Sequence, residues 1–315
     1  MSPEVAVVIV SFNTRERTLA CVRSVRAHPP ARRCEIVVVD NASSDGTAEA
    51  LEREFPGMSV IRSPENLGFA RAVNLGARSA SAEHLLLLNP DTVVRPGALP
   101  ALLAFAREHP EHGLYGGRTF REDGELDPSS CWGAPTLWSL ACFASGLSTA
   151  FAGSALFDPE SLGSWRRDTV REVPVVTGCL LLVRRDAFLD LGGLDERFFL
   201  YGEDAEFSLR AARAGMRPVI VPAAAIVHAV GASTGARGRK MTMVLAGKVT
   251  LLRAAWSPLR ARVGVGMLTS GVRLRAALES ITRRRDRMWS HAWEHRGDWL
   301  PGYPAAKQLI FGTTP

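Results

Sequence analysis

The chain has 315 residues, of which 46% are hydrophobic and 22% are charged, which suits one large α/β domain or one domain with an appendage. Its five cysteines lie far apart without Cys-x-x-Cys spacing, which excludes a zinc site of that type and a disulfide framework, and favours a reducing cytoplasm. The absence of an 18-residue apolar run excludes a membrane-spanning helix, and the strand pattern that begins at Val5 argues against a signal peptide.

The net charge of +6 is unevenly distributed. Residues 237–296 contain 14 Lys and Arg against 3 Asp and Glu, a net of +11, so the rest of the chain carries −5. An acidic domain is therefore followed by a basic tail. Such a tail suits anionic lipid, pyrophosphate or nucleic acid.

The first predicted strand is the continuous β-branched run at residues 5–10, which is typical of a strand covered on both faces in a parallel sheet. A helix is predicted over residues 18–25. The polar loop between them contains Ser11, Phe12 and Asn13.

The second predicted strand, at residues 36–39, ends in Asp40 and Asn41 and leads to a helix over residues 48–54. This alternation predicts a doubly wound α/β domain. Ligands of such sheets bind beyond the carboxyl ends of the strands, where both loops lie. Taken alone, Asp40 is also explained as a turn residue, because its surroundings are rich in turn formers.

A short strand at residues 60–61 precedes a segment that contains Asn66, Gly68 and Asn74. The pattern predicts a helix N-terminus opened by a glycine, whose backbone N–H groups favour phosphates. An ordinary capped helix explains the same pattern. The next apolar strand, at residues 85–88, ends in Asn89-Pro90-Asp91, where Asp91 is either a turn residue or a metal ligand.

Residues 131–157 match no single pattern of secondary structure. Three interpretations fit this region: an acceptor loop, a membrane-facing segment, or a packed insert of loops and helices. Strands are expected at residues 113–120, 173–183, 219–221 and 225–227, and helices at 96–108, 241–255 and 259–278.

A distinctive stretch runs from Thr177 to Gly215, with an apolar strand, a Gly-Gly break, aromatic residues and the acidic pair Glu203 and Asp204. Acidic residues are favoured in the first turn of a helix by its dipole, and this alone explains the pair. Carboxylates beside glycine and aromatic residues also suit a pocket wall that activates a hydroxyl.

Taken together, five ordered motifs over about three quarters of the chain resemble the inverting family 2 glycosyltransferases, which have the GT-A fold. The motifs are VSFN, DNAS, the segment NLGFARAVNLG, NPDT and the acidic stretch followed by His228. The rhamnosyltransferase-like and galactofuranosyltransferase-like branches are the most similar. The resemblance implies a GT-A domain over residues 1–235, with a Rossmann-like doubly wound sheet, and a basic helical extension over residues 236–315.

The same resemblance assigns roles. Asp204 corresponds to the general base, with Glu203 orienting the acceptor or Asp204, and Asp91 and His228 correspond to ligands of Mg²⁺ or Mn²⁺. The first aspartate of the family's Asp-x-Asp is Asn89 here, a departure that weakens the expected metal site. Asp40 corresponds to the residue that contacts the nucleotide base. The other positions implied to bind the nucleotide-sugar are Ser11, Phe12, Asn13, Asn41, Asn66, Gly68, Asn74 and Asn89.

Thr177 and Gly178 correspond to positions near the acceptor. The implied reaction is transfer of a sugar, with L-rhamnose from dTDP-L-rhamnose as the first choice and a UDP-sugar as another, to a cell-surface glycan or a lipid-linked acceptor. Two other classes stay open: an inactive scaffold of the same fold, favoured by Asn89, and a protein that binds nucleic acid or lipid through its basic tail. No nucleic-acid motif occurs, and the lack of GxGxxG after the first strand disfavours a dinucleotide-dependent oxidoreductase.

The tail itself has two interpretations. It is a solvated helical appendage, or it binds the inner face of the plasma membrane peripherally, with arginines at the headgroups and tryptophans at the interface. The residues to which the second interpretation assigns this contact are Arg283, Arg284, Arg285, Arg287, Trp289, Trp293 and Trp299.

Overall fold

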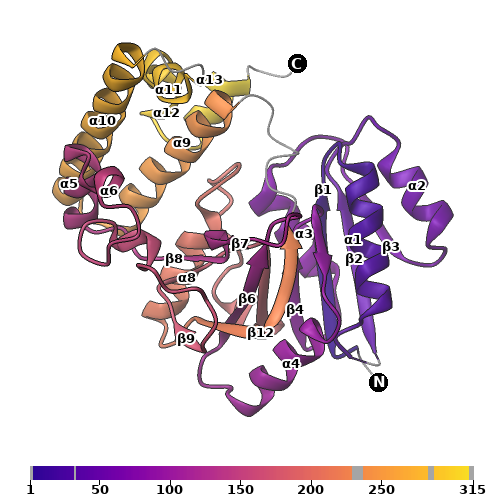
Figure 1. The fold of residues 1–315 in the computed structure, drawn as a ribbon. Helices are drawn as coiled ribbons and strands as arrows, with labels where there is room; N and C mark the ends of the chain where they lie inside the picture. Colours follow the sequence, from indigo (N-terminus) through magenta and orange to yellow (C-terminus); the bar gives the residue numbers. More distant parts are fainter. Residues whose placement is uncertain (1–2, 32, 229–236, 283–286, 312–315) are drawn as a thin grey trace. The chain divides into compact units, whose positions relative to one another are not determined.

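The computed structural model describes residues 3–31, 33–228, 237–282 and 287–311 (Figure 1). The boundary predicted at residues 235–236 therefore falls outside the described residues, as do Arg283, Arg284 and Arg285. Contacts divide the chain into two units. The first unit comprises Met1–Trp132, Arg166–Asp195 and Phe207–Ser233, and the second comprises Gly133–Trp165, Glu196–Glu206 and Thr234–Pro315.

The first unit is built on a mixed sheet, and its first half is parallel. The strands of this half lie in the order β3-β2-β1-β4, with bounds Ser59–Arg62, Cys34–Asp40, Val5–Ser11 and His84–Leu88. Every residue of β1 and β4 is buried, as expected for strands covered on both faces. Ser11 pairs with Asp40 and Ile9 with Leu88, so the loops after these three strands emerge at one edge.

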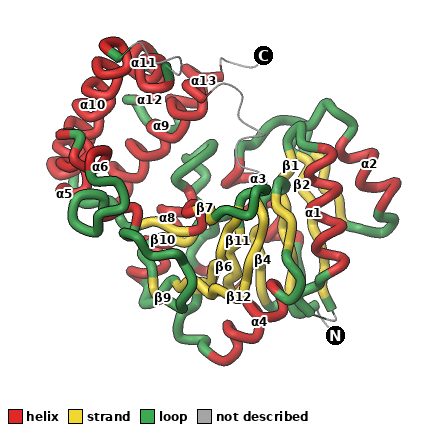
Figure 2. The backbone as a smooth tube through the Cα atoms, in the orientation of Figure 1, coloured by secondary structure: helices red, strands yellow, loops and turns green. Residues whose placement is uncertain are grey.

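The second half of the sheet continues in the order β11-β6-β12-β5. Figure 2 labels the first three of these strands. The strands of this half are β11 Leu180–Arg184, β6 Leu114–Phe120, β12 Val219–His228 and β5 Thr92–Val94, with β7 Leu126–Asp127 on β6 and β9 Arg171–Glu172 on β12. β11 runs antiparallel to β4, and β12 runs antiparallel to β5. The start of β11 and the end of β12 therefore lie at the same sheet edge as the end of β4.

Helices cover both faces of the parallel half, which confirms the doubly wound arrangement. They are α1 Arg15–Ala27, α2 Thr47–Glu54 and α3 Phe69–Ser79. A fourth helix, α4 Ala98–Glu108, contacts β12 and β6 in the second half of the sheet. α1 shares a core with Val7 and Ile9 of β1. On the other face, a Cβ added at Gly76 of α3 would lie 2.6 Å from Val8, so glycine allows α3 to approach the sheet closely.

Two of the predicted strands differ from the observed ones. The strand predicted at residues 173–183 is broken at Thr177-Gly178 into β10 Val175–Val176, which pairs with β8 Cys131–Trp132, and β11. The two strands predicted at 219–221 and 225–227 are one strand, β12, with an irregular register between Ile220 and Ala225. A helix, α7 Arg185–Asp190, follows β11.

The second unit is helical in its described part. Its helices are α5 Leu137–Ser145, α6 Leu147–Ala150, α9 Arg237–Ala255, α10 Pro258–Ile281, α11 Met288–Glu294, α12 Arg296–Trp299 and α13 Ala305–Phe311. The helices α5 and α6 show that residues 131–157 contain an insert of loops and helices. None of the helices in the described part of the chain combines the length and the apolar character needed to cross a bilayer.

Polar contacts join the insert to the tail helices. The guanidinium of Arg275 in α10 is buried, stacks on the ring of Phe143 at 3.7 Å and donates to the Phe143 carbonyl and the Thr149 hydroxyl. Trp299 is fully buried and donates its Nε1–H to the carbonyl of Ala292. The prediction that Trp299 lies at a membrane interface is therefore wrong, because the residue belongs to the helical core.

The tail helices also hold the segment just before the acidic pair. Tyr201 and Gly202 adopt positive φ angles of 70° and 100°, and helix α9 passes them at Gly247. A Cβ added at Gly247 would lie 2.0 Å from the carbonyl oxygen of Tyr201. The hydroxyl of Tyr303 donates to the carbonyl of Leu200 at 3.1 Å. The tail is therefore structural support for this segment, beyond any role as a solvated appendage.

We predict that Gly247→Ala lowers the free energy of unfolding by about 1–3 kcal/mol, because backbone atoms block the added methyl group. The matched control is Gly266→Ala in helix α10, where the added Cβ meets nothing within 4 Å. That change should raise the free energy of unfolding by about 0.5–1 kcal/mol, as alanine does when it replaces glycine in an exposed helix. Urea denaturation measures both, and equal effects of the two changes would contradict the close approach at Gly247.

Candidate active site

The site begins in the first unit, where the loops after β1 and β2 lie side by side. The backbone N–H of Asn41 donates to the carbonyl of Ser11 at 2.8 Å. The buried Ser11 hydroxyl bonds to those of Thr14 and Thr18 at 3.1 and 2.8 Å. Ser11 thus anchors its loop through an internal hydroxyl cluster and presents its backbone to the neighbouring strand.

Asn13 links the same two loops. Its Oδ1 accepts from the backbone N–H of Ser44 at 2.8 Å, and its own N–H donates to the hydroxyl of Ser43 at 3.0 Å. Asn13 has a φ of 52°, a left-handed conformation that asparagine tolerates better than most residues. Phe12, between these anchors, is 41% exposed, so the loop offers an aromatic ring to solvent.

Asp40, the last residue of β2, is buried and has an unsatisfied oxygen. Its Oδ1 makes no hydrogen bond. Burial raises the pKa of Asp40, an effect that hydrogen bonds from Ser43 reduce in part. A buried polar atom without a partner costs free energy, so an oxygen in this position is suited to a ligand that supplies a donor.

Asn41 and Asn66 shape the adjoining loop. The Asn41 amide donates to Asn66 Oδ1 at 2.9 Å and accepts from the N–H of Leu67 at 2.9 Å. Asn66 Oδ1 also accepts from the N–H of Gly68 at 2.9 Å. These bonds fix the turn that precedes α3, and Gly68, with a φ of 81°, is the residue before the helix. The predicted start of a helix at this glycine is confirmed.

Asn74 binds backbone of the distinctive stretch. Its Nδ2 donates to the carbonyl of Leu194 at 2.8 Å, and its Oδ1 accepts from the N–H of Leu194 at 2.9 Å. A Cβ added at Gly193 would lie 2.4 Å from Asn74 Oδ1. The Gly-Gly break therefore lets the chain approach α3, and Asn74 holds it there.

The residues predicted as metal ligands lie together. His228 Nε2 is 3.2 Å from Asp91 Oδ1, because His228, the last residue of β12, pairs with Thr92 of β5. Burial alone would lower the pKa of His228, but the carboxylates of Asp127 and Asp91 outweigh it and raise the pKa to about 9. His228 is therefore protonated at neutral pH in this arrangement.

The backbone of Asn89 forms hydrogen bonds to the neighbouring segments. Its N–H donates to the carbonyl of Cys179 at 3.3 Å, and its carbonyl accepts from the hydroxyl of Thr92 at 2.7 Å. No cluster of three His, Cys, Asp or Glu side chains arranged around a common metal position occurs among the described residues. A cation here would therefore depend on one carboxylate, one imidazole and the ligand's own oxygens, a donor set that fits Mn²⁺ or Mg²⁺ bound with a diphosphate.

Thr177 and Gly178 lie at the break between β10 and β11. The Thr177 hydroxyl donates to the backbone carbonyls of Ser129 and Ser130 at 2.9 and 3.1 Å. Gly178 is buried next to it. Thr177 therefore ties the start of β11 to the segment after β7, and its hydroxyl is already engaged within the protein.

The acidic pair opens helix α8, Glu203–Arg213, and both of its members are assigned to the second unit. Glu203 is buried, its Oε2 has no hydrogen-bond partner, and burial together with the charge of Asp204 raises the pKa of Glu203 to about 8. Asp204 is more accessible than Glu203. At neutral pH Glu203 is therefore mostly protonated.

Comparison with known proteins places the chain in a family. The model of glycosyl transferase family 2 matches residues 6–192, more than half of the chain, and that of glycosyl transferase family group 2 matches residues 143–293. The chain belongs to glycosyl transferase family 2. It is therefore a glycosyltransferase, and the resemblance found in its motifs is confirmed.

Relatives of this family 2 enzyme include a rhamnosyltransferase. The N-acetylglucosaminyl-diphospho-decaprenol L-rhamnosyltransferase of Mycobacterium tuberculosis is 32% identical over 248 residues, which cover 74% of this chain and 77% of the relative. The O-antigen biosynthesis protein RfbC of Myxococcus xanthus is 28% identical over 236 residues, which cover 74% of this chain and 18% of that protein. The rhamnosyltransferase-like branch is thus supported by sequence over most of the chain.

Solved structures share the fold. A mannosyltransferase from Pyrobaculum calidifontis, in complex with GDP-Man and Mn²⁺, has a TM-score of 0.59 at 18% identity, covering 100% of this chain and 89% of that one. GalNAc-T7 with UDP, GalNAc and Mn²⁺ has a TM-score of 0.61 at 17% identity, covering 96% of this chain and 58% of that one. The family 2 enzyme accordingly has the predicted GT-A fold with C-terminal helices.

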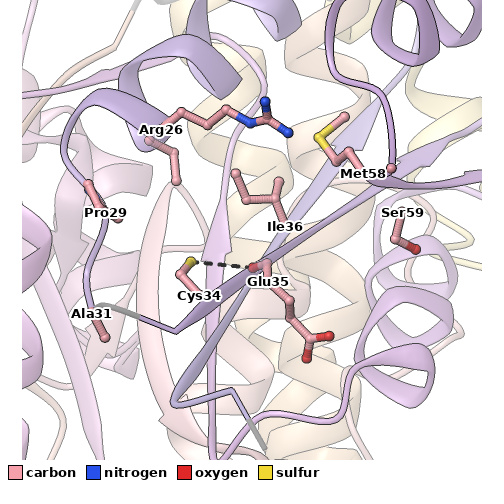
Figure 3. A pocket seen from close by; sticks show the side chains of 10 residues that line it. Arg26, Pro29, Ala31, Cys34, Glu35, Ile36, Met58 and Ser59 are labelled. Atoms are coloured by element: carbon pink, nitrogen blue, oxygen red, sulfur yellow. Dashed lines mark hydrogen bonds between the residues drawn. The ribbon is translucent and has the colours of Figure 1, made fainter.

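A cavity of about 480 Å³ lies elsewhere in the first unit (Figure 3). Its walls include Arg26, Cys34 and Met58. Cys34 is the first residue of β2 and Asp40 the last, so the cavity lies at the sheet edge opposite to the loops described above. Burial raises the pKa of the Cys34 thiol to about 12, so this thiol is protonated and a poor nucleophile.

Sequence reasoning missed Asp127. Its carboxylate is buried and its Oδ2 lies 3.7 Å from His228 Nδ1, on the side of the ring away from Asp91. Burial would raise the pKa of Asp127, but hydrogen bonds and the charge of His228 lower it. The residue occurs in the string Glu-Leu-Asp-Pro-Ser, which has turn formers but no apolar periodicity. Only the pairing of β7 with β6 brings Asp127 to this edge.

We predict that Glu203→Gln stabilises the enzyme at high pH. The pKa of Glu203 is raised to about 8 in the folded chain, above its ordinary value of 4.5, so ionisation opposes folding and stability falls as pH rises between these values. Glutamine keeps the neutral form. The melting temperature of the variant should match that of the wild type near pH 5 and exceed it by roughly 2 °C or more at pH 9.

The exposed Glu122 provides the control for this measurement. The melting temperature of Glu122→Gln should change between pH 5 and pH 9 by the same amount as that of the wild type. A Glu203→Gln variant whose melting temperature differs from the wild type by the same amount at every pH would show that Glu203 is ionised in the folded protein.

Proposed function

We propose that this glycosyltransferase transfers L-rhamnose from dTDP-L-rhamnose, with inversion at the anomeric carbon, to a hydroxyl of a lipid-linked glycan. The observation that carries this proposal is the 32% identity to a relative whose name states rhamnosyl transfer to N-acetylglucosaminyl-diphospho-decaprenol. The match covers 77% of that relative. A UDP-sugar is the alternative donor.

The donor nucleotide is assigned to the loops after β1 and β2. Asp40 Oδ1 is buried without a partner, and the N–H edge of a pyrimidine is a donor of the kind that would satisfy it. Phe12 is exposed beside this loop and offers a surface for the base or ribose. Asn13, Asn41 and Asn66 act by holding the loops, since their side chains bond to neighbouring loop residues.

The metal is assigned to Asp91 and His228, whose donor atoms lie 3.2 Å apart. Mn²⁺ or Mg²⁺ would neutralise negative charge on the leaving diphosphate when bound. His228 then has to bind as the neutral ring, so it gives up a proton. The Asn89 side chain adds no carboxylate, which makes the diphosphate oxygens of the donor an essential part of the site.

The acceptor roles are assigned by the resemblance of the motifs, to the acidic pair in the second unit and to Thr177 and Gly178 in the first. Asp204 takes the proton from the attacking hydroxyl, while the acceptor oxygen bonds to the anomeric carbon and the bond from that carbon to the diphosphate breaks. Glu203, neutral at pH 7, leaves the charge to Asp204 and adds a donor that orients it or the acceptor. Thr177 and Gly178 contribute backbone at the acceptor side.

We predict that Asp204→Asn reduces rhamnosyl transfer from dTDP-L-rhamnose by about 10²–10⁴-fold, because the amide accepts no proton from the acceptor. The assay is transfer to an N-acetylglucosaminyl-diphospho-lipid. Stabilisation by dTDP with Mn²⁺ in a thermal-shift measurement should be retained in this variant, since Asp204 is not assigned to the donor.

The control is Asp190→Asn, an exposed carboxylate of helix α7, which should leave both activity and dTDP binding unchanged. Transfer that survives in Asp204→Asn would overturn the assignment of the base. Stabilisation by UDP and not by dTDP would overturn the choice of donor and favour a UDP-sugar.

We infer in addition that the second unit contacts the anionic inner face of the membrane where the lipid-linked acceptor resides. The support is an apolar and basic surface at the start of α10. Leu259 is 73% exposed and Val263 is exposed as well, and Arg260 and Arg262 lie between them in solvent. Alternation of apolar and cationic residues suits the boundary between acyl chains and anionic headgroups.

Helix α5 extends this surface. A Cβ added at Gly264 would meet Leu140, and one added at Gly271 would meet Phe143, so α5 and α10 run in the same direction and the first turn of α5 lies beside the second turn of α10. Trp138, in the first turn of α5, is 49% exposed and donates its Nε1–H to the carbonyl of Leu156. An exposed amphipathic tryptophan on a helix packed against this part of α10 suits a membrane-surface contact.

We predict that Leu259→Ser combined with Arg262→Glu weakens binding to vesicles that contain phosphatidylglycerol by about tenfold, because the change removes apolar area and reverses one charge. Vesicle co-sedimentation measures this. Arg53→Glu, an exposed arginine of α2, is the matched control and should bind as the wild type does. The proposed membrane contact would be contradicted if the double variant bound the vesicles as tightly as the wild type does. It would also be contradicted if the wild type bound DNA and not these vesicles.

A further inference from the structure

The environment of His228 has a second side that the proposed reaction does not use. Nε2 faces Asp91 at 3.2 Å, and Nδ1 faces Asp127 Oδ2 at 3.7 Å. The three side chains are at most 14% exposed. The two nitrogens of an imidazole ring diverge, so one metal ion cannot be bound by Asp91, His228 Nε2 and Asp127 together. Asp127 therefore acts on the ring and not on the cation.

Asp127 is itself held in place. It pairs with Thr119 of β6 through strand β7 and caps the short helix Pro128–Ser130, whose Ser129 N–H donates to Asp127 Oδ1 at 3.0 Å. One carboxylate oxygen is thus committed to the backbone. The other, Oδ2, is buried without a hydrogen-bond partner, and His228 Nδ1 is likewise buried and unsatisfied. The two unsatisfied atoms face each other just beyond hydrogen-bond distance.

This geometry has a defined chemical use. A histidine that ligates a cation presents a lone pair on one nitrogen, and the other nitrogen then carries the proton. A carboxylate beside the protonated nitrogen fixes this tautomer, orients the ring and makes the ligating nitrogen more basic. Asp127 faces Nδ1, so it selects the tautomer whose lone pair is on Nε2, the nitrogen that faces Asp91.

The geometry points to Asp127 as a positioning residue that prepares His228 for a divalent cation bound with the donor diphosphate. This inference rests on the proposed metal role of Asp91 and His228. Asp127 touches neither the cation nor the sugar, and its effect is on the affinity for the cation. A merely structural Asp127 would affect folding and leave that affinity unchanged once the protein is folded.

The test is Asp127→Asn in the full chain, with Mn²⁺ as the probe and the dissociation constant measured by electron paramagnetic resonance in the presence of dTDP. Asparagine is nearly isosteric and still caps the helix with its carbonyl oxygen. Its amide then faces His228 Nδ1 as a donor and favours the wrong tautomer. Mn²⁺ should bind about 10–100-fold more weakly than in the wild type.

Two further readouts separate this role from a structural one. Asp127→Asn should bind dTDP without metal as the wild type does. Its rate of sugar transfer should be low at limiting Mn²⁺ and should recover as the Mn²⁺ concentration is raised. The matched control is Asp123→Asn, an exposed aspartate of the same turn region, whose carboxylate accepts from the Glu125 N–H. It should bind Mn²⁺ as tightly as the wild type does.

Asp127→Ser provides an independent variant, because serine is also a good N-cap but is too short to reach His228. Both variants should show the same loss. Wild-type affinity for Mn²⁺ in either variant would overturn the inference and leave the proposed function intact. A wild-type enzyme that binds dTDP equally well with and without Mn²⁺ would overturn the metal assignment, and this inference with it.

Discussion

The site depends first on the backbone hydrogen bonds that pair β12 with its neighbours. Antiparallel pairing with β5 places His228 opposite Thr92 and next to Asp91, and parallel pairing with β6 brings the same histidine near Asp127, which β7 adds to that strand. Successive residues of a strand point to opposite faces, so a slip of one residue would turn the imidazole away from both carboxylates. Three distant segments are thus brought together by register, and no single one of them forms the site.

The first half of the fold is predictable because its signals are local. The continuous apolar runs of β1, β2 and β4 indicate buried parallel strands, and parallel strands share the edge at which their carboxyl ends lie. That reasoning brings Ser11, Asp40 and Asn89 to one edge without knowledge of the structure. The role of each side chain was harder to predict, because Ser11 and Asn74 form hydrogen bonds within the protein.

The rest depends on long-range pairing that no local pattern encodes. The apolar run before and after Thr177-Gly178 looks uniform, yet it belongs to two strands in different sheets. Asp127 lies in a two-residue strand among turn formers, so its role becomes visible only through its partners. The helical periodicity of the tail predicts α9 correctly but is silent on Gly247, whose contact with Tyr201 makes the tail a support for the acidic segment.

Each of the two units contains buried carboxylate oxygens that have no hydrogen-bond partner. Asp40, Asp127 and Glu203 each hold one such oxygen among the described residues, and each bears a cost that folding alone would select against. The cost is tolerable for different reasons. Asp40 can take a donor from a nucleotide base, and Asp127 faces an imidazole N–H. Glu203 has neither partner, and burial keeps its carboxyl group mostly protonated at neutral pH.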